Sequence, residues 1–139
     1  MQVMTRKINL QSNHEEELFD ITEKVQNELD TTELTCGIVS VFAIGSTCSL
    51  ATLEFEPGLV ADFSQVMARF VPKDLDYEHH KTWLDDNGRS HLKASLLGQS
   101  LTIPFVDKKL VMGTWQQLIF IEWDTRPRKR TIVVQVLGQ

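Results

Sequence analysis

The sequence has no apolar run that approaches the roughly 18 residues of a membrane-spanning helix, which excludes a bilayer-spanning protein. Its N-terminus also lacks the apolar central region and small-residue cleavage site of a secretory signal. Cysteine is scarce, because Cys36 and Cys48 are too few and too far apart for a zinc knuckle or a CxxC redox pair. We therefore predict a cytoplasmic protein without membrane contact, whose two cysteines are reduced and buried.

Positive charge is also in short supply. The formal net charge is -5 at pH 7, which disfavours general nucleic-acid binding, because phosphate neutralisation needs a basic surface. The charge is uneven: eight acidic residues and one lysine lie between His14 and Leu34, whereas a basic cluster runs from Arg126 to Arg130. Both stretches suit solvated faces, and the basic cluster also suits an anion site or a subunit contact.

What is present suits one globular domain. The 139 residues are 42% hydrophobic and 24% charged, near the averages of globular proteins. A chain of this length buries enough surface to form a core. There is no Gly-x-Gly-x-x-Gly motif and no alternating strand-helix rhythm, which argues against a parallel nucleotide-binding sheet. We predict a single domain over residues 1–139, with an α+β fold of antiparallel sheets and two main helices.

Two amphipathic stretches predict the main helices. Ser12-Asn13-His14-Glu15 has capping-box spacing. An apolar stripe at helical intervals follows it: Leu18, Ile21, Val25 and Leu29. The second helix starts after the turn Glu56-Pro57-Gly58 and ends at Val71-Pro72, because the residue before proline disfavours helix. A shorter helix is predicted from Leu92 to Leu97, ended by Gly98.

Runs of β-branched and aromatic residues predict the strands. They cover residues 2–10, 35–44, 48–55, 101–105, 110–112, 116–122 and 131–137. Gly45-Ser46-Thr47 is predicted as a turn between two of them, and Asp124 to Arg128 as the hairpin between the last two. Lys73 to Ser90 reads as a long ordered loop that forms a wall of a site.

Three of the four histidines, His79, His80 and His91, lie within thirteen residues of one another. Imidazole serves as a metal ligand or as an acid and base near neutral pH. Because Trp83 and Leu84 need burial, we expect the loop to fold back and set His79 near His91. A metal would need a third ligand such as Glu54, Asp62 or Asp85, and the alternative is that these histidines are structural.

Hydroxyl and cationic side chains suggest a phosphate site. Ser46 and Thr47, in a glycine turn, together with Arg89 and Lys93, suit a cradle of backbone amides and cations. The alternative is an ordinary hairpin turn with surface cations. No serine lies in a Gly-x-Ser-x-Gly motif, so nucleophilic hydrolysis has little support.

Gln116 follows Trp115, which we expect in the core. Gln116 either binds a ligand, contacts a histidine or pairs within the sheet.

Several segments together resemble the YjbQ family (UPF0047) between about Gly37 and Gly138. The matching segments are Gly-Ser-Thr-Cys-Ser-Leu-Ala-Thr-Leu-Glu-Phe-Glu-Pro-Gly-Leu, Tyr-Glu-His, Asn-Gly-Arg-Ser-His-Leu-Lys-Ala-Ser-Leu-Leu-Gly, Gly-Thr-Trp-Gln and Arg-Pro-Arg-Lys-Arg. The resemblance implies an antiparallel α+β fold, a cytoplasmic homotrimer and, as described for some members, a thiamine-phosphate synthase side activity. Many members have histidine where this chain has Gly45, which weakens a three-histidine metal site.

The resemblance carries the family's polar site onto His79 and His91, with Glu54, Lys93 and Gln116 as further motif positions. We predict an enzyme-like trimer that binds a phosphorylated small molecule with a divalent metal ion, zinc or magnesium, and has weak thiamine-phosphate synthase activity. The predicted roles are catalytic for His91, Lys93 and Gln116, phosphate-binding for Ser46, Thr47, Arg89 and Lys93, and metal-binding for His79, His91 and Glu54. The alternative is a non-catalytic metal- or phosphate-binding protein, or a structural trimer.

The apolar face of one predicted strand supports the trimer. Ile119, Ile121 and Trp123 alternate along that strand and form a face more apolar than a monomer needs.

Overall fold

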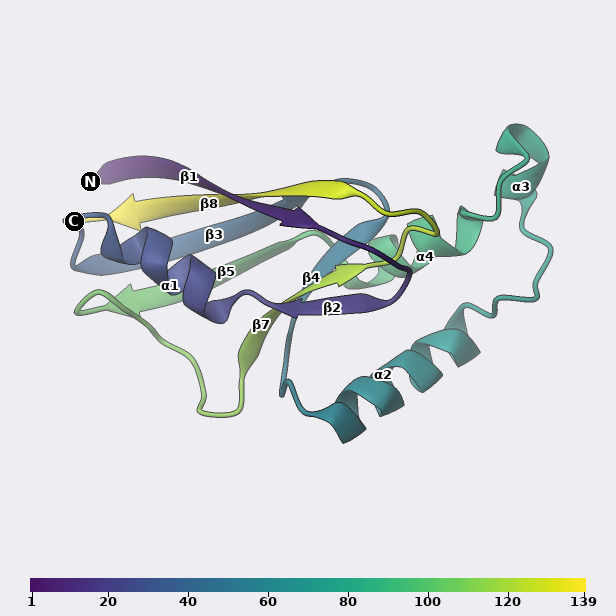
Figure 1. The fold of residues 1–139 in the computed structure, drawn as a ribbon. Coiled ribbons are helices and arrows are strands. Elements are labelled where there is room, and N and C mark those ends of the chain that lie inside the picture. The colour runs from purple at the N-terminus through teal and green to yellow at the C-terminus, as the bar shows by residue number, and fades with distance from the viewer.

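Two antiparallel sheets form the framework of the computed structural model, which describes residues 1–139 (Figure 1). The large sheet has the strand order β1 (Gln2–Gln11), β8 (Lys129–Gly138), β3 (Cys36–Ile44), β5 (Ser100–Val106) and β6 (Lys109–Leu110). The small sheet has the order β2 (Glu17–Asp20), β7 (Gln117–Glu122) and β4 (Cys48–Leu53). Every neighbouring pair is antiparallel, so the predicted α+β fold with antiparallel sheets is confirmed.

Four helices accompany the sheets. They are α1 (Thr22–Asp30), α2 (Pro57–Phe70), α3 (Glu78–Trp83) and α4 (Gly88–Leu97). At the start of α2 the Glu56 carboxylate accepts hydrogen bonds from the backbone N–H groups of Gly58 and Leu59, and Pro57 occupies the first helical position. Gly98 ends α4 as predicted. No helix is long and apolar enough to cross a membrane.

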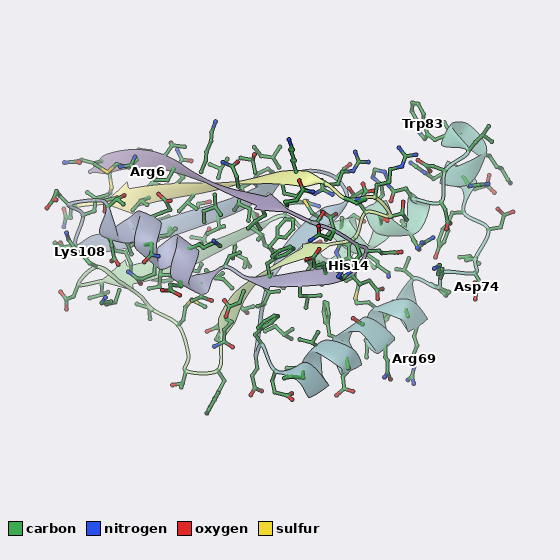
Figure 2. The ribbon with its side chains drawn as sticks, viewed as in Figure 1. Arg6, His14, Arg69, Asp74, Trp83 and Lys108 are labelled. Carbon is green, nitrogen blue, oxygen red and sulfur yellow. The ribbon has the colours of Figure 1, made fainter.

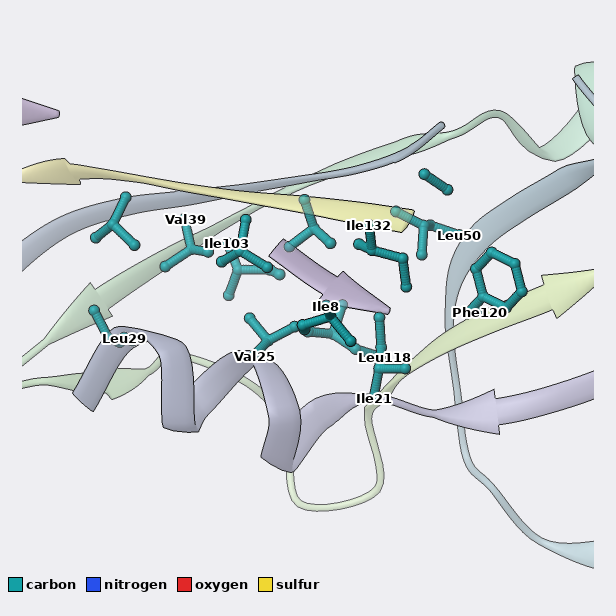
Figure 3. Close-up of a cluster of buried hydrophobic side chains, with 14 of the residues drawn as sticks. Ile8, Ile21, Val25, Leu29, Val39, Leu50, Ile103, Leu118, Phe120 and Ile132 are labelled. Atoms are coloured by element: carbon teal, nitrogen blue, oxygen red, sulfur yellow. The ribbon is translucent and has the colours of Figure 1, made fainter. Parts of the chain in front are cut away.

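The main core lies between the large sheet, α1 and the small sheet (Figure 3). Val25 and Leu29 of α1 and Phe120 of β7 pack against the inner face of the large sheet, which contributes Val39 and Ile132. Burying such apolar side chains stabilises the fold by about 1.5–3 kcal/mol each. Because these side chains are buried in the core, they cannot line a site at the surface.

A second core covers the other face of the small sheet. Ile119, Ile121 and Trp123 of β7 and its extension pack there with Met67 of α2 and Ala94 of α4. All three β7-side residues are buried within the chain. The sequence-based argument that they form a subunit contact is therefore wrong: this apolar strand is buried on both faces within one molecule, by α2 and α4 on one side and by the main core on the other.

The first predicted helix has Ile21 as its N-cap, nine residues after Ser12, the cap that the capping box suggests. Residues 17–20 pair with β7 instead, because this strand buries Leu18 and Phe19 against the small sheet. Ser12 does not cap a helix; its hydroxyl bridges to the backbone of Arg128, accepting from N–H at 2.9 Å. Local spacing was overridden by a long-range strand pairing.

The predicted hairpin between the last two strands is also wrong. β7 and β8 follow each other in the chain but belong to different sheets, and so do β3 and β4. The segment from Asp124 to Arg128 thus carries the chain from one sheet to the other. Of the basic cluster only Arg130 is buried between the sheets, whereas Arg126, Arg128 and Lys129 remain exposed.

The predicted loop from Lys73 to Ser90 contains α3 and the first turn of α4. Its aromatic and apolar residues are not buried: Trp83 is 70% exposed and Leu84 is 82% exposed. Figure 2 shows Trp83 at the outer end of α3, pointing away from the rest of the molecule. Trp115 is also exposed, at 72%, contrary to the expectation of a core residue.

Candidate functional site

His79 and His91 lie side by side between α3 and α4. Their ring centroids are 4.7 Å apart and the rings are tilted by 44°. Gly88 allows this close approach, since a Cβ at that position would lie 3.1 Å from the Cβ atoms of both His79 and Tyr77. The expected convergence of the two imidazoles is observed, but helix packing through a glycine produces it, and not burial of Trp83 and Leu84.

Two buried polar atoms in the α3–α4 region have no hydrogen-bond partner. They are His79 Nδ1 and Ser90 Oγ, and no other buried side-chain nitrogen or oxygen of the chain lacks one. His79 Nδ1 lies 3.3 Å from Asp85 Oδ1 without the geometry of a hydrogen bond. Because buried polar groups are nearly always satisfied, these two atoms need a partner that the chain does not supply, such as a water molecule, an ion or a ligand.

The remaining histidine of the segment has a structural role. His80 Nδ1 makes a hydrogen bond with the backbone carbonyl of Asp85, which holds the turn between α3 and α4. His14, in the turn after β1, is exposed.

Arg89 and Lys93 face away from the histidine pair. They are four residues apart on α4, whereas His91 lies two residues from each and so on the opposite side of the helix. Arg89 forms a bidentate pair with Glu15, at 2.7 and 2.9 Å, and also binds Asp86 at 2.6 Å. The hydrogen bonds that the guanidinium donates to Glu15 raise the pKa of Arg89 above its ordinary value.

Lys93 is almost completely buried. Its ammonium group donates to Glu16 Oε1 at 2.7 Å and lies 5.0 Å from the centre of the Trp123 ring. The acidic stretch was interpreted as a solvated face, but Glu15 and Glu16 pair with these two buried cations. The structure therefore does not bring Lys93 or Arg89 together with His91.

Glu54 and Gln116 lie at the other end of the small sheet. Asn87, just before α4, donates to Asp124 beside the end of β7 that pairs with Cys48. Glu54 follows the far end of β4, six steps of about 3.3 Å from Cys48. Gln116 donates to Thr52 at 3.3 Å near that same far end. Within one chain, neither Glu54 nor Gln116 can join the histidine pair.

The three predicted metal ligands consequently do not form a cluster. No group of three or more His, Cys, Asp or Glu side chains in this chain is arranged to hold a metal ion. Of His79, His91 and Glu54, only the two histidines lie together, and Asp85 Oδ1 lies 3.3 Å from His79 Nδ1.

The predicted phosphate turn contributes to a buried polar network. Ser46 is exposed, but Thr47 is buried and donates to Asp124 Oδ2 at 2.9 Å. Asp124 also accepts from Asn87 and Arg128, which links the β3–β4 turn and the basic cluster to the start of α4. Thr47 therefore holds the framework of the site and is not free to bind phosphate.

Arg130, the last residue of the basic cluster, pairs with Glu122 inside the protein. Its guanidinium donates to both carboxylate oxygens, at 2.8 and 2.6 Å, and to Thr47 Oγ1 at 2.8 Å. Burial alone lowers the pKa of Arg130, but the hydrogen bonds to Glu122 outweigh it and the pKa is raised. Burial also raises the pKa of the nearby Cys48 thiol to about 11, so this thiol is neutral and unreactive.

The network makes stability depend on pH through Asp124. Burial by itself raises the pKa of Asp124, but hydrogen bonds from the Arg126 backbone, Thr47, Asn87 and Arg128 outweigh it and hold the pKa below its ordinary value of about 3.9. The ionised carboxylate therefore stabilises the fold above that ordinary value, and this contribution is lost as the pH falls through the lower folded-state pKa.

We expect Asp124→Asn to be less stable than the wild type at pH 7, with a gap that narrows below about pH 4. Urea unfolding at pH 7 and pH 3 measures the difference in unfolding free energy between the variant and the wild type. Asp74→Asn, at an exposed position outside the network, is the control. A gap of equal size at pH 7 and pH 3 would contradict the assigned ionisation.

Known proteins resemble the chain along its whole length. The profile of the family described as UPF0047 protein YjbQ-like matches residues 6–139. A UPF0047 protein of Methanothermobacter thermautotrophicus is 37% identical over 139 residues, covering 100% of this chain and 95% of the relative. YjbQ of Escherichia coli O157:H7 is 29% identical over 121 residues, covering 86% and 87%.

Solved structures show the same fold. A protein of Sulfolobus solfataricus, described as YbjQ-like and of unknown function, has a TM-score of 0.93 at 31% identity and covers 99% of each chain. A YjbQ/UPF0047 family protein of Clostridium acetobutylicum has a TM-score of 0.85 at 29% identity, covering 94% of this chain and 99% of its own.

Proposed function

The chain belongs to the UPF0047 YjbQ-like family, and from this membership together with the paired imidazoles we propose that the protein binds a phosphorylated small molecule through a divalent metal ion held by His79 and His91. The observation that carries the proposal is the approach of the two rings to 4.7 Å, with His79 Nδ1 turned toward Asp85 at 3.3 Å. A cytoplasmic location is part of the proposal, since two free thiols suit a reducing compartment.

The donor set supports zinc better than magnesium. Imidazole nitrogen suits zinc, whereas magnesium prefers carboxylate, phosphate and water oxygens. Two histidines supply fewer than the three protein ligands usual in catalytic zinc sites, so ligand oxygens and water would take the other positions. Asp85 would orient His79 from behind, as carboxylates commonly do for metal-binding histidines. When bound, such an ion supplies a Lewis acid for a phosphate oxygen.

The reaction to test is thiamine-phosphate synthesis. It joins a pyrimidine pyrophosphate to a thiazole phosphate with loss of pyrophosphate. His91 would act in this reaction as a ligand of the metal ion, because its ring is partly exposed and has no hydrogen-bond partner in the chain. A coupled assay should detect weak turnover in the wild type and none in His91→Ala.

A second candidate function is non-catalytic metal or phosphate binding. It is favoured by one observation: Lys93 and Gln116, the other two predicted catalytic residues, lie away from His91 in the chain. Metal binding without turnover would select this alternative.

We expect His79→Ala and His91→Ala each to weaken zinc binding by more than the roughly 10–100-fold that outer hydrogen-bonding partners contribute, because each change removes a direct ligand. Calorimetric titration of zinc into the metal-free protein measures the affinity. His14→Ala, at an exposed histidine in the turn after β1, is the matched control. Unchanged zinc affinity in both site variants would refute the shared metal site.

The homotrimer is also part of the proposal, on a different surface from the one the sequence suggested. The outer face of the large sheet carries the side chains of β1, β8, β3 and β5 that point away from the core, and no helix covers it (Figure 1). Its exposed apolar members are Val3, Ile38, Phe42, Ile44 and Val106. An apolar patch of this kind marks a contact surface.

Charge favours further copies of this chain as the partner for the outer face. None of its side chains is acidic, although the chain has a net charge of -5. The face carries apolar and neutral groups with the basic side chains of Lys7 and Lys129, so copies that meet through it keep their acidic surfaces apart.

A further inference from the structure

A small cavity lies on the side of α4 opposite the histidines. It has a volume of about 220 Å³ and lies between the end of α2, α4 and the turn that joins β1 to β2. Its polar lining consists of Glu15, Glu16, Lys73, Arg89 and Lys93. The volume is below the range of about 300–1,000 Å³ typical of drug-sized ligands, so an occupant would be small.

Lys93 presents unused hydrogen-bond donors to this cavity. Its ammonium group has three N–H bonds, but Glu16 Oε1 is its only hydrogen-bond acceptor in the chain. The side chain is 3% exposed, so bulk water does not replace the missing acceptors. A buried ammonium normally has its donors satisfied, and here the cavity is the space in which acceptors would lie.

Lys73 adds a second source of donors. It is exposed at the cavity, and no carboxylate lies within 4 Å of its ammonium group. The acceptors of the lining are largely occupied, since Glu15 uses both oxygens for Arg89 and Glu16 uses one for Lys93. Lys93 pairs with Glu16, and Arg89 pairs with Glu15 and Asp86, which leaves Lys73 as the unpaired cation of the lining. An occupant should therefore be rich in acceptor oxygens and negatively charged.

We propose that this cavity binds a phosphate group, either free or as a small phosphate monoester, with Lys73 and Lys93 as its donors. Arg89 keeps its pairs with Glu15 and Asp86 and holds the wall of the cavity. The site is separate from the proposed metal site, because α4 directs His91 and Lys93 to opposite sides. It goes beyond the proposed function in that it needs no metal ion.

Lys73→Gln tests the proposal, because it removes the unpaired charge at an exposed position and should leave the fold intact. Inorganic phosphate and glycerol phosphate are titrated calorimetrically into the metal-free full-length protein at constant ionic strength. The expected result is a dissociation constant raised about 10-fold or more in Lys73→Gln, as for the loss of one charged hydrogen bond. Lys81→Gln, at an exposed lysine of α3, is the control and should bind like the wild type.

The outcomes separate this site from the metal site. Binding of free phosphate or of the monoester, retained in His79→Ala and His91→Ala, supports the proposal, and the tighter of the two probes identifies the source of the phosphate. Absence of binding to the wild type, or equal loss in Lys73→Gln and Lys81→Gln, overturns it. Loss of phosphate binding in the histidine variants also overturns it, because the phosphate would then belong to the site between α3 and α4.

Discussion

Replacement of Arg130 by methionine will destabilise the protein by about 3–5 kcal/mol, since it leaves a buried carboxylate without its cation. Glu122 is completely buried and receives two hydrogen bonds from this one guanidinium. Arg130 belongs to β8 of the large sheet, whereas Glu122 ends β7 of the small sheet. The pair thus joins the two sheets, and the loss of one partner weakens the junction as well as the local contacts.

Urea unfolding at pH 7 and one fixed protein concentration measures the lost free energy of unfolding. In thermal unfolding, we expect the melting temperature to fall by roughly 10–20 °C. Lys129→Met, at the exposed neighbouring position, should change the stability by less than about 0.5 kcal/mol. The double variant Glu122→Leu, Arg130→Met should recover much of the loss, because an apolar pair leaves no buried charge. A loss below about 1 kcal/mol for Arg130→Met would show that the carboxylate finds other partners.

Phe42→Lys will convert the proposed trimer into single chains. Phe42 lies on β3, the middle strand of the large sheet, and is 48% exposed on the outer face. A lysine there keeps its charge in water while the chain is alone. In an assembly it would bury a charge without a partner, which costs several kcal/mol per chain.

Light scattering at micromolar concentration measures the effect. The wild type should show about three times the 15.9 kDa mass of one chain, and Phe42→Lys should show the mass of one chain. Leu96→Lys, at a 64% exposed position of α4 outside the outer face, is the matched control and should remain a trimer. A wild-type mass of one chain would refute the trimer, and a trimeric Phe42→Lys would place the contact elsewhere.

The stability of the Arg130 network also bears on the histidine pair. The network that contains Arg130 and Thr47 reaches Asn87 at the start of α4 through Asp124. Variants of the network are therefore expected to shift α4 and the histidine it carries. Zinc binding should be compared only among variants whose folding has been verified.

Much of the fold was predictable from local patterns. The turn Glu56-Pro57-Gly58 located α2, and Gly98 located the end of α4, because capping and proline effects act within a few residues. The β-branched and aromatic residues of β7 predicted a strand there. The hydrophobic periods and the missing nucleotide-binding motif were enough to predict an antiparallel α+β protein.

Other predictions failed where distant segments compete for the same residues. Ser12 has the spacing of a helix cap, yet it contacts Arg128, which lies 116 residues away in the sequence. The final two strands look like a hairpin, yet they join different sheets. Local propensity cannot weigh such alternatives, because the gain from pairing with a distant strand is absent from the local sequence.

For the site, the sequence by itself determined which residues have suitable chemistry and that His79 and His91 are close in the chain. Only the tertiary structure decided how they are grouped. The helical turn of α4 separates Arg89 and Lys93 from His91, and the length of the small sheet separates Glu54 and Gln116 from all three. Proximity in sequence fixes the residue types available, but the direction of each side chain depends on secondary structure, and the partner that it meets depends on packing between elements far apart in the chain.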